Sequence, residues 1–122
     1  MNRNKGTDLE PAEHGGIYAI MVDKKPIYIG YTMREFKERF QEHIDRIKGL
    51  DHPNLSLYTN MTDYEKEHYS FTILFDVKKV KYKRKFNGPF TRRELKCIEC
   101  AFIYAFKPKY NESGVTQPYC FL

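Results

Sequence analysis

Long hydrophobic runs and tryptophan are both missing from this chain of 122 residues. No apolar stretch approaches the roughly 18 residues that a membrane-spanning helix needs. Residues 1–13 are polar and lack the apolar core of a secretory signal. We therefore expect a soluble protein inside the cell, in the cytoplasm, the nucleoid or the nucleus, with no membrane partner.

Cysteine is also scarce, with three residues in the chain. Cys97 and Cys100 lie three positions apart within a segment that we predict to be helical, and Cys120 lies near the C-terminus. An odd number at this spacing is poor ground for a disulfide framework. Cys97 and Cys100 also lack a second Cys or His pair at zinc-site spacing, so a structural metal role is a weak alternative.

Internal repeats, low-complexity segments and linkers are absent too, and a chain of this length fits one hydrophobic core. Hydrophobic residues make up 41% of the chain and aromatic residues 16%, which is the composition of a folded protein. We expect a single domain over residues 14–122, after a flexible lead-in over residues 1–13 that contributes little to the core. The net charge of +5 favours a polyanionic partner.

Three segments have the composition of β-strands. Gly16–Val22 and Pro26–Tyr31 are rich in branched and aromatic residues and are separated by a polar turn, which predicts a hairpin. Tyr69–Val77 alternates in part and predicts a third strand. The interval Leu50–Glu67 is predicted to be a loop, with room for a short helical turn.

Two segments have the pattern of helices. Between Met33 and Lys48 the apolar residues recur every three or four positions and share about 80° of a helical wheel. Thr91-Arg92-Arg93-Glu94 matches a capping box, which predicts a second helix from there to about Phe106, before Pro108. The combined pattern predicts an α+β fold in which an antiparallel three-stranded sheet is flanked by α-helices.

Several short motifs follow one another in a recognisable order. Gly16-Ile17-Tyr18 is followed by Tyr28-Ile29-Gly30, then by Arg39, His43, Glu99 and Asn111. This order resembles the catalytic domain of the GIY-YIG endonuclease family over roughly Gly15 to Glu112. The resemblance implies the nuclease fold of that family and metal-dependent hydrolysis of phosphodiester bonds, with DNA as the expected substrate.

Arg39 and His43 are four positions apart and share one helix face, at the shoulder of the apolar stripe. Spacing alone favours a cation that anchors the helix beside a core-edge histidine. The resemblance instead implies catalytic roles, and a planar guanidinium can meet two phosphate oxygens at once. The interval from Gly30 to Arg39 is one residue longer than in some branches of the family, so Arg34 is the alternative arginine.

Glu99 is the only charged residue between Cys97 and Phe106, at the edge of an apolar stripe. A carboxylate there loses hydration and needs a cationic partner. The resemblance implies that Glu99 is the ligand of one Mg²⁺ or Mn²⁺, a Lewis acid for the departing 3′ oxygen. The alternative is an internal salt bridge with Arg39.

The resemblance also implies a tyrosine general base, for which Tyr18 and Tyr28 are the two candidates. They lie ten positions apart across a short turn and can face the same side of the sheet. A phenol needs a neighbour that stabilises its phenolate, and Arg39, His43 or the metal would serve. We favour Tyr28 as the base, with Tyr18 orienting the water or the phosphate; strand packing is the structural alternative.

The remaining candidates concern substrate contacts. The resemblance implies that Asn111 orients groups near the tyrosines or the scissile phosphate, although it could instead cap the turn after Pro108. Tyr31, Thr32 and Arg34 lie at the start of the first predicted helix, whose free N–H groups suit an anionic backbone, and are candidate substrate contacts.

Six cations occupy the eight residues from Lys78 to Lys85. In an extended chain four of them would line one face and could follow nucleic-acid phosphates: Lys79, Lys81, Lys83 and Lys85. The alternative is a solvated hairpin. A homodimer or a partner protein could supply target specificity, and the alternative function is a catalytically silent nucleic-acid-binding module of the same fold.

Overall fold

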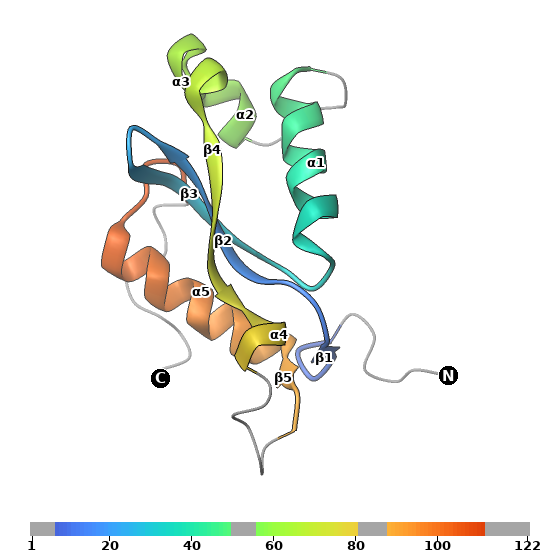
Figure 1. Ribbon diagram of the computed structural model, residues 1–122. Coiled ribbons are helices and arrows are strands. Elements are labelled where there is room, and N and C mark those ends of the chain that lie inside the picture. Colours follow the sequence, from blue (N-terminus) through green and yellow to red (C-terminus); the bar gives the residue numbers. More distant parts are fainter. Residues whose placement is uncertain (1–6, 50–55, 81–87, 112–122) are drawn as a thin grey trace.

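The computed structural model describes residues 7–49, 56–80 and 88–111. Its centre is an antiparallel sheet of three strands in the order β3-β2-β4. These strands are β2 (Gly16–Val22), β3 (Lys25–Thr32) and β4 (Ser70–Asp76). Helices α1 (Phe36–Ile47) and α5 (Arg92–Phe106) lie on opposite sides of it (Figure 1). The predicted α+β class with a three-stranded antiparallel sheet is confirmed.

The predicted hairpin is present and brings the two motif tyrosines to one side of the sheet. Tyr18 pairs with Gly30, and Ile20 pairs with Tyr28. Since alternate residues share a face, Tyr18 and Tyr28 point the same way. The two turn residues, Asp23 and Lys24, both have positive φ, at 53° and 67°, as a tight hairpin turn that follows the strand twist requires.

Both long helices form close to where the pattern predicts. In α5 the predicted capping box is present: the Thr91 side chain accepts the N–H of Glu94, and the Glu94 side chain accepts the N–H of Thr91. Helix α1 begins three residues later than the apolar pattern, at Phe36. The hydroxyl of Thr32 accepts the N–H of Arg34 at 3.1 Å, which stabilises a turn before the helix.

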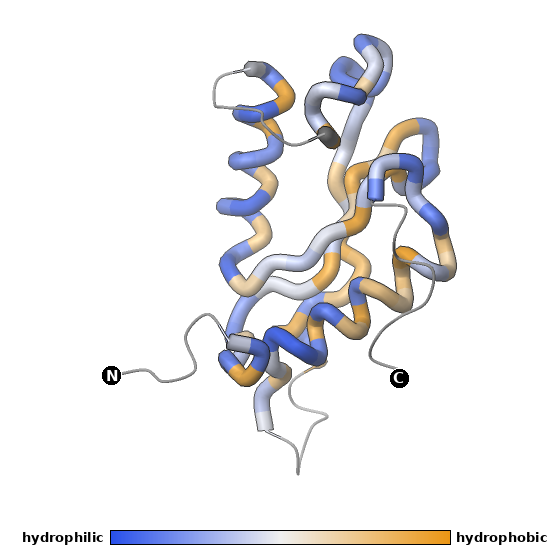
Figure 2. Tube along the Cα trace, turned by 180° about the vertical axis from the view of Figure 1, so that it is seen from behind, coloured by the Kyte–Doolittle hydropathy of each residue, from blue (hydrophilic) through white to orange (hydrophobic). Residues whose placement is uncertain are grey.

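Apolar side chains fill both faces of the sheet. On the α5 side Ile17, Ala19 and Ile29 pack with Leu95 and Ile103. On the α1 side a second cluster joins strand residues to the helices there: Ile20, Val22, Ile27, Ile47, Leu57, Tyr58 and Met61. Figure 2 shows hydrophobic residues along the strands and α5, whereas α1 is mostly hydrophilic. Within the described ranges no helix is long and apolar enough to cross a membrane.

The segment predicted to be a loop contains two short helices, α2 (Ser56–Asn60) and α3 (Asp63–His68). Helix α3 has its own capping box between Thr62 and Glu65. The sequence pattern Thr-x-x-Glu that marks α5 therefore occurs here as well. We read the segment as a loop because these helices are too short to show an apolar period.

Residues 7–13 also differ from the predicted flexible lead-in. Pro11–Ala12 forms strand β1, which pairs with β5 (Phe90–Thr91), and Ala12 is buried in the core. A two-residue strand has no periodicity of its own, so only its pairing partner reveals it.

The basic segment is helical where it is described. Lys79 lies on α4 (Val77–Val80) and not on an extended ribbon, and Lys78 forms a salt bridge with Glu35 at 2.7 Å. Lys81, Lys83 and Lys85 lie outside the described residues.

Candidate active site

Tyr18 stands at the centre of a buried hydrogen-bond network on the α1 side of the sheet. Its hydroxyl lies 2.7 Å from Nε2 of His43 and accepts the Nε–H of Arg39 at 3.1 Å. The other ring nitrogen of His43, Nδ1, lies 2.7 Å from the hydroxyl of Tyr58 on α2. One strand and two helices therefore position these four side chains, and Tyr18 and His43 are fully buried.

His43 is neutral in this setting. Burial, and then the charges of Arg39 and Arg46, lower its pKa to about 3. A neutral imidazole donates one hydrogen bond and accepts one. One of the two hydroxyls, that of Tyr18 or that of Tyr58, therefore donates to the ring of His43, and the other accepts its N–H.

Gly30 makes room for both tyrosines. A Cβ atom at this position would lie 2.7 Å from the hydroxyl oxygen of Tyr18 and 3.0 Å from Cε2 of Tyr28. Gly30 pairs with Tyr18 across the hairpin, so the phenol ring lies over bare backbone. Gly30 of the Tyr28-Ile29-Gly30 motif is thus required for the position of Tyr18 in the Gly16-Ile17-Tyr18 motif.

Arg39 is held at two of its nitrogens. Nε donates to Tyr18, and Nη1 donates to Oε1 of Glu42 at 2.8 Å. The third nitrogen, Nη2, makes no hydrogen bond to a residue in the described ranges. With 19% of its side chain exposed, Arg39 lies at the surface of the network and can present this nitrogen to an anion.

Tyr28 lies beside the network, and the charge of Glu99 on α5 acts on it. The ring of Tyr28 is 5.8 Å from that of His43, centroid to centroid. Burial and the charge of Glu99 raise the pKa of Tyr28 to about 12. Burial raises the pKa of Glu99 itself to about 7, against the N–H of Tyr31 and the charge of Lys96, which lower it. Glu99 forms no salt bridge with Arg39 or any other described residue.

Asn111 is bound to the outer edge of β3. Its Oδ1 accepts the N–H of Ile29 and its Nδ2 donates to the carbonyl of Ile29, both at 2.8 Å. The N–H of Tyr110 donates to the carbonyl of Ile27, also at 2.8 Å. The side chain therefore substitutes for a neighbouring strand and fixes the backbone between Tyr28 and Gly30, without a hydrogen bond to either tyrosine hydroxyl.

The three residues before α1 that we predict to contact substrate lie in different surroundings. Tyr31 packs against the α5 side, and its hydroxyl accepts from Arg92 at 3.2 Å. Thr32 is buried, with its hydroxyl bound to the N–H of Arg34. Only Arg34 reaches the network, through Glu42 at 2.6 Å. The structure thus brings Tyr18, Arg39 and His43 together in hydrogen bonds, with Tyr28 beside them. Glu99 lies on α5 and acts on Tyr28 through its charge, and Asn111 lies at the outer edge of β3.

Two members of the network are absent from the sequence prediction. Glu42 follows Arg39 by three positions, which is the spacing of a helical ion pair, so the sequence did contain a signal for it. Tyr58 lies in the segment that we predicted to be a loop, and no local pattern connects it with His43.

A largely hydrated divalent cation fits the donor set at Glu99. Within the described residues no group of three or more His, Cys, Asp or Glu side chains is arranged to hold a metal. Mg²⁺ commonly keeps several waters and uses only one or two carboxylates, whereas a structural zinc site needs four protein ligands. Glu99 is partly buried and has a raised pKa, so a bound cation would stabilise its ionised form.

Comparisons of the chain with models of known protein families, with curated proteins and with solved structures found no match.

Proposed function

We propose that this protein is a metal-dependent endonuclease of the GIY-YIG type, which hydrolyses phosphodiester bonds of DNA. The observation that carries the proposal is the contact of Tyr18 with both His43 and Arg39, beside Tyr28, whose pKa the charge of Glu99 raises. Phosphodiester hydrolysis needs a base for the attacking water, compensation of charge on the phosphate oxygens and assistance to the leaving oxygen. These residues offer a group for each requirement.

Arg39 is the group that offsets negative charge on the phosphate. Its Nε and Nη1 are held by Tyr18 and Glu42, so the guanidinium plane is oriented before substrate arrives. His43 and Tyr58 hold Tyr18 in turn. In this proposal Tyr18, His43 and Tyr58 position Arg39 and do not transfer the reacting proton.

Tyr28 is the proposed general base. Its side chain is only partly buried, whereas Tyr18 is fully buried and its hydroxyl already has two partners. The negative charge of Glu99 is one of the causes that raise the pKa of Tyr28. Neutralising that charge would favour the phenolate, which accepts the proton of the water whose oxygen attacks phosphorus.

Glu99 is the residue that would hold a divalent cation. When bound, Mg²⁺ or Mn²⁺ supplies Lewis-acid assistance to the departing 3′ oxygen. The backbone of Tyr31 in β3 lowers the pKa of Glu99, which favours the ionised form that a cation needs.

The test compares wild-type protein with Glu99→Gln on supercoiled plasmid in Mg²⁺. The exposed Glu67 on α3 gives a matched control, Glu67→Gln, with the same change of charge. We expect nicked or linear product from wild type and control, and a loss of at least roughly a hundredfold in Glu99→Gln. Mg²⁺ should also raise the melting temperature of wild type but not of Glu99→Gln.

Equal cleavage by all three proteins would contradict the proposal. Tight DNA binding by wild type with no cleavage in Mg²⁺ or Mn²⁺ would instead support the alternative, a catalytically silent nucleic-acid-binding module.

A further inference from the structure

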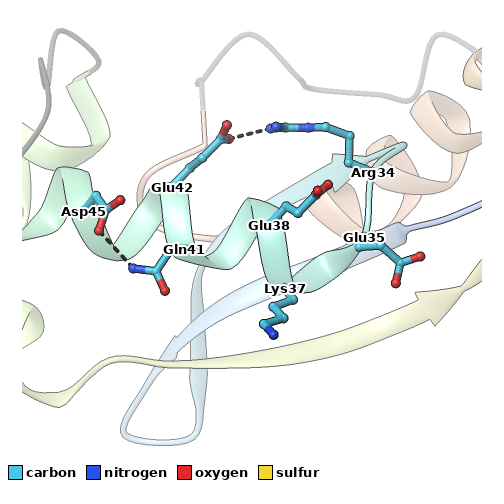
Figure 3. Close-up of a pocket in the computed structure, with 7 residues that line it drawn as sticks. All are labelled: Arg34, Glu35, Lys37, Glu38, Gln41, Glu42 and Asp45. Atoms are coloured by element: carbon cyan, nitrogen blue, oxygen red, sulfur yellow. Dashed lines mark hydrogen bonds and ion pairs between the residues drawn. The ribbon is translucent and has the colours of Figure 1, made fainter.

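One carboxylate oxygen joins two arginines at the start of α1. Oε1 of Glu42 accepts from Nη2 of Arg34 at 2.6 Å and from Nη1 of Arg39 at 2.8 Å. Figure 3 shows the side chain of Arg34 reaching from before the helix across to Glu42. Two guanidinium groups that share one oxygen atom repel each other unless an anion lies between them. The point that Oε1 of Glu42 occupies, between the two guanidinium groups, is therefore a binding position for the oxygen of an anion.

The three side chains differ in their access to solvent. Arg34 is 52% exposed and Glu42 34%, but Arg39 only 19%. Arg39 is held by its hydrogen bond to the buried hydroxyl of Tyr18, whereas the side chain of Glu42 is near enough to the surface to rotate into water. A ligand can thus replace the carboxylate of Glu42 without disturbing the buried network.

We propose that Arg34 and Arg39 form a phosphate clamp in which Glu42 is an internal counterion that the substrate phosphate displaces. This inference deepens the proposed function, because the identification of the ligand as a backbone phosphate rests on it. Paired guanidinium groups suit phosphate because each presents a planar fork of N–H donors. A Lys at either position would supply charge without this fork.

The surroundings limit the direction from which a nucleic acid can reach the clamp. The outer face of α1 forms an open groove whose acids are Glu35, Glu38, Glu42 and Asp45. A polyanion lying along this face would meet like charge at every turn of the helix. The substrate backbone therefore crosses α1 at the clamp, near Arg34, and does not run along the helix.

Glu42 competes with the ligand at every physiological pH. The hydrogen bond from Arg34, followed by the hydrogen bond from Arg39 and the charges of both arginines, lowers its pKa to about 2 despite partial burial. Protonation therefore does not release the clamp, and only an anion of higher charge or better geometry displaces the carboxylate. Inorganic phosphate is the simplest such anion.

The test measures phosphate binding without divalent cations, so turnover plays no part in it. Inorganic phosphate is titrated while the Nε–H signal of Arg39 is followed by NMR, and a short DNA duplex is titrated in parallel in EDTA. Glu42→Gln is paired with Glu38→Gln, and Arg34→Gln with Lys37→Gln. Glu38 and Lys37 line the same groove and match the changes of charge.

We expect opposite effects from the two informative variants. Glu42→Gln should tighten phosphate binding by about fivefold, because a competing partly buried ion pair is removed. Arg34→Gln should weaken binding by about fivefold to tenfold, through the loss of one fork. Both controls should stay within about twofold of wild type, because long-range surface charge is screened by salt.

Weaker or unchanged binding in Glu42→Gln would overturn the proposal, as would equal effects of Arg34→Gln and Lys37→Gln. A wild-type protein that shows these binding effects but never cleaves DNA would contradict only the proposed nuclease function. Cleavage of DNA with none of these effects would contradict only the clamp.

Discussion

Tyr18 and Tyr28 have the same chemistry but different surroundings. Tyr18 is fully buried and bound to His43 and Arg39, whereas Tyr28 is partly buried and feels the charge of Glu99. Spacing in the sequence predicts that they share a face, and it cannot rank them as bases. Our proposal ranks them by exposure and by the charge of Glu99 on Tyr28, and both follow from packing.

The two tyrosines should therefore respond differently to loss of the hydroxyl. Tyr28→Phe should reduce single-turnover cleavage by about a hundredfold or more with little change in stability. Tyr18→Phe should reduce the free energy of unfolding by about 1–3 kcal/mol, because His43 and Arg39 lose a buried partner, and should lower cleavage less. Cleavage assays and urea unfolding of both variants would check this, and the reverse ranking would assign the base to Tyr18.

His43 should make the stability of the fold depend on pH in a defined direction. Its folded pKa of about 3 lies below the ordinary value of 6.5. Below pH 6.5 the unfolded chain binds a proton that the folded protein does not, so stability is complete above that pH and falls towards pH 3. The slope approaches about 1.4 kcal/mol per pH unit.

The measurement compares wild type with His43→Gln by urea unfolding between pH 7 and pH 4.5. Glu99 is present in both proteins, so its contribution cancels in the difference. Its pKa is raised from 4.5 to about 7, and this shift by itself lowers the stability of the fold as the pH rises through that range. We expect the advantage of wild type to shrink as the pH falls. A constant difference would show that His43 is not held neutral.

At the scale of elements, the hairpin places the site and Gly30 sets how closely its parts approach. Gly30 has no side chain to separate the ring of Tyr18 from the backbone of β3, and Asn111 holds the same stretch from the other edge. The functional groups are thus fixed by main-chain geometry. The short helix α2 completes the network by bringing Tyr58 to His43.

Gly30→Ala should displace Tyr18. The added Cβ would lie 2.7 Å from its hydroxyl oxygen and 2.9 Å from Cζ, an overlap that costs about 1–3 kcal/mol in a packed site. We expect reduced cleavage together with a lower melting temperature. At Gly49 a Cβ would meet nothing within 4 Å, so Gly49→Ala, strained only by its positive φ, should leave cleavage intact. Equal cleavage by both variants would argue against the close approach.

At the scale of the whole molecule, the N-terminal residues and α5 hold each other in place. Arg92 donates to Glu10 at 2.7 Å, to the carbonyl of Thr7 at 3.2 Å and to the hydroxyl of Tyr31 at 3.2 Å. Strand β1 pairs with β5 just before the helix. Residues more than 80 positions apart in sequence thereby fix the end of the helix that bears Glu99.

Arg92→Gln should lower the free energy of unfolding by about 1–2 kcal/mol, because three acceptors, two of them partly buried side chains, lose a charged donor. The neighbouring Arg93 is exposed, and Arg93→Gln should change stability by less than about 0.5 kcal/mol. Thermal and urea unfolding of both variants would check the difference. Equal stability would mean that β1 is held by its strand pairing alone.

Elements with local signals could be predicted from the order of residues alone. Alternating apolar residues specify the hairpin, the period of Phe36, Phe40 and Ile47 specifies α1, and the capping box at Thr91 specifies α5, because each depends on neighbours in the chain. The motif order also selected Arg39 and His43, both of which hydrogen-bond to Tyr18.

Burial and pairing, in contrast, depend on how distant segments pack. Tyr58 hydrogen-bonds to His43, and Tyr31 lies on the α5 side. Asn111 binds the edge of β3, and Glu42 bridges two arginines. The physical reason is that hydrogen bonds and desolvation depend on contacts between distant segments, and a linear pattern of residue types does not contain those distances.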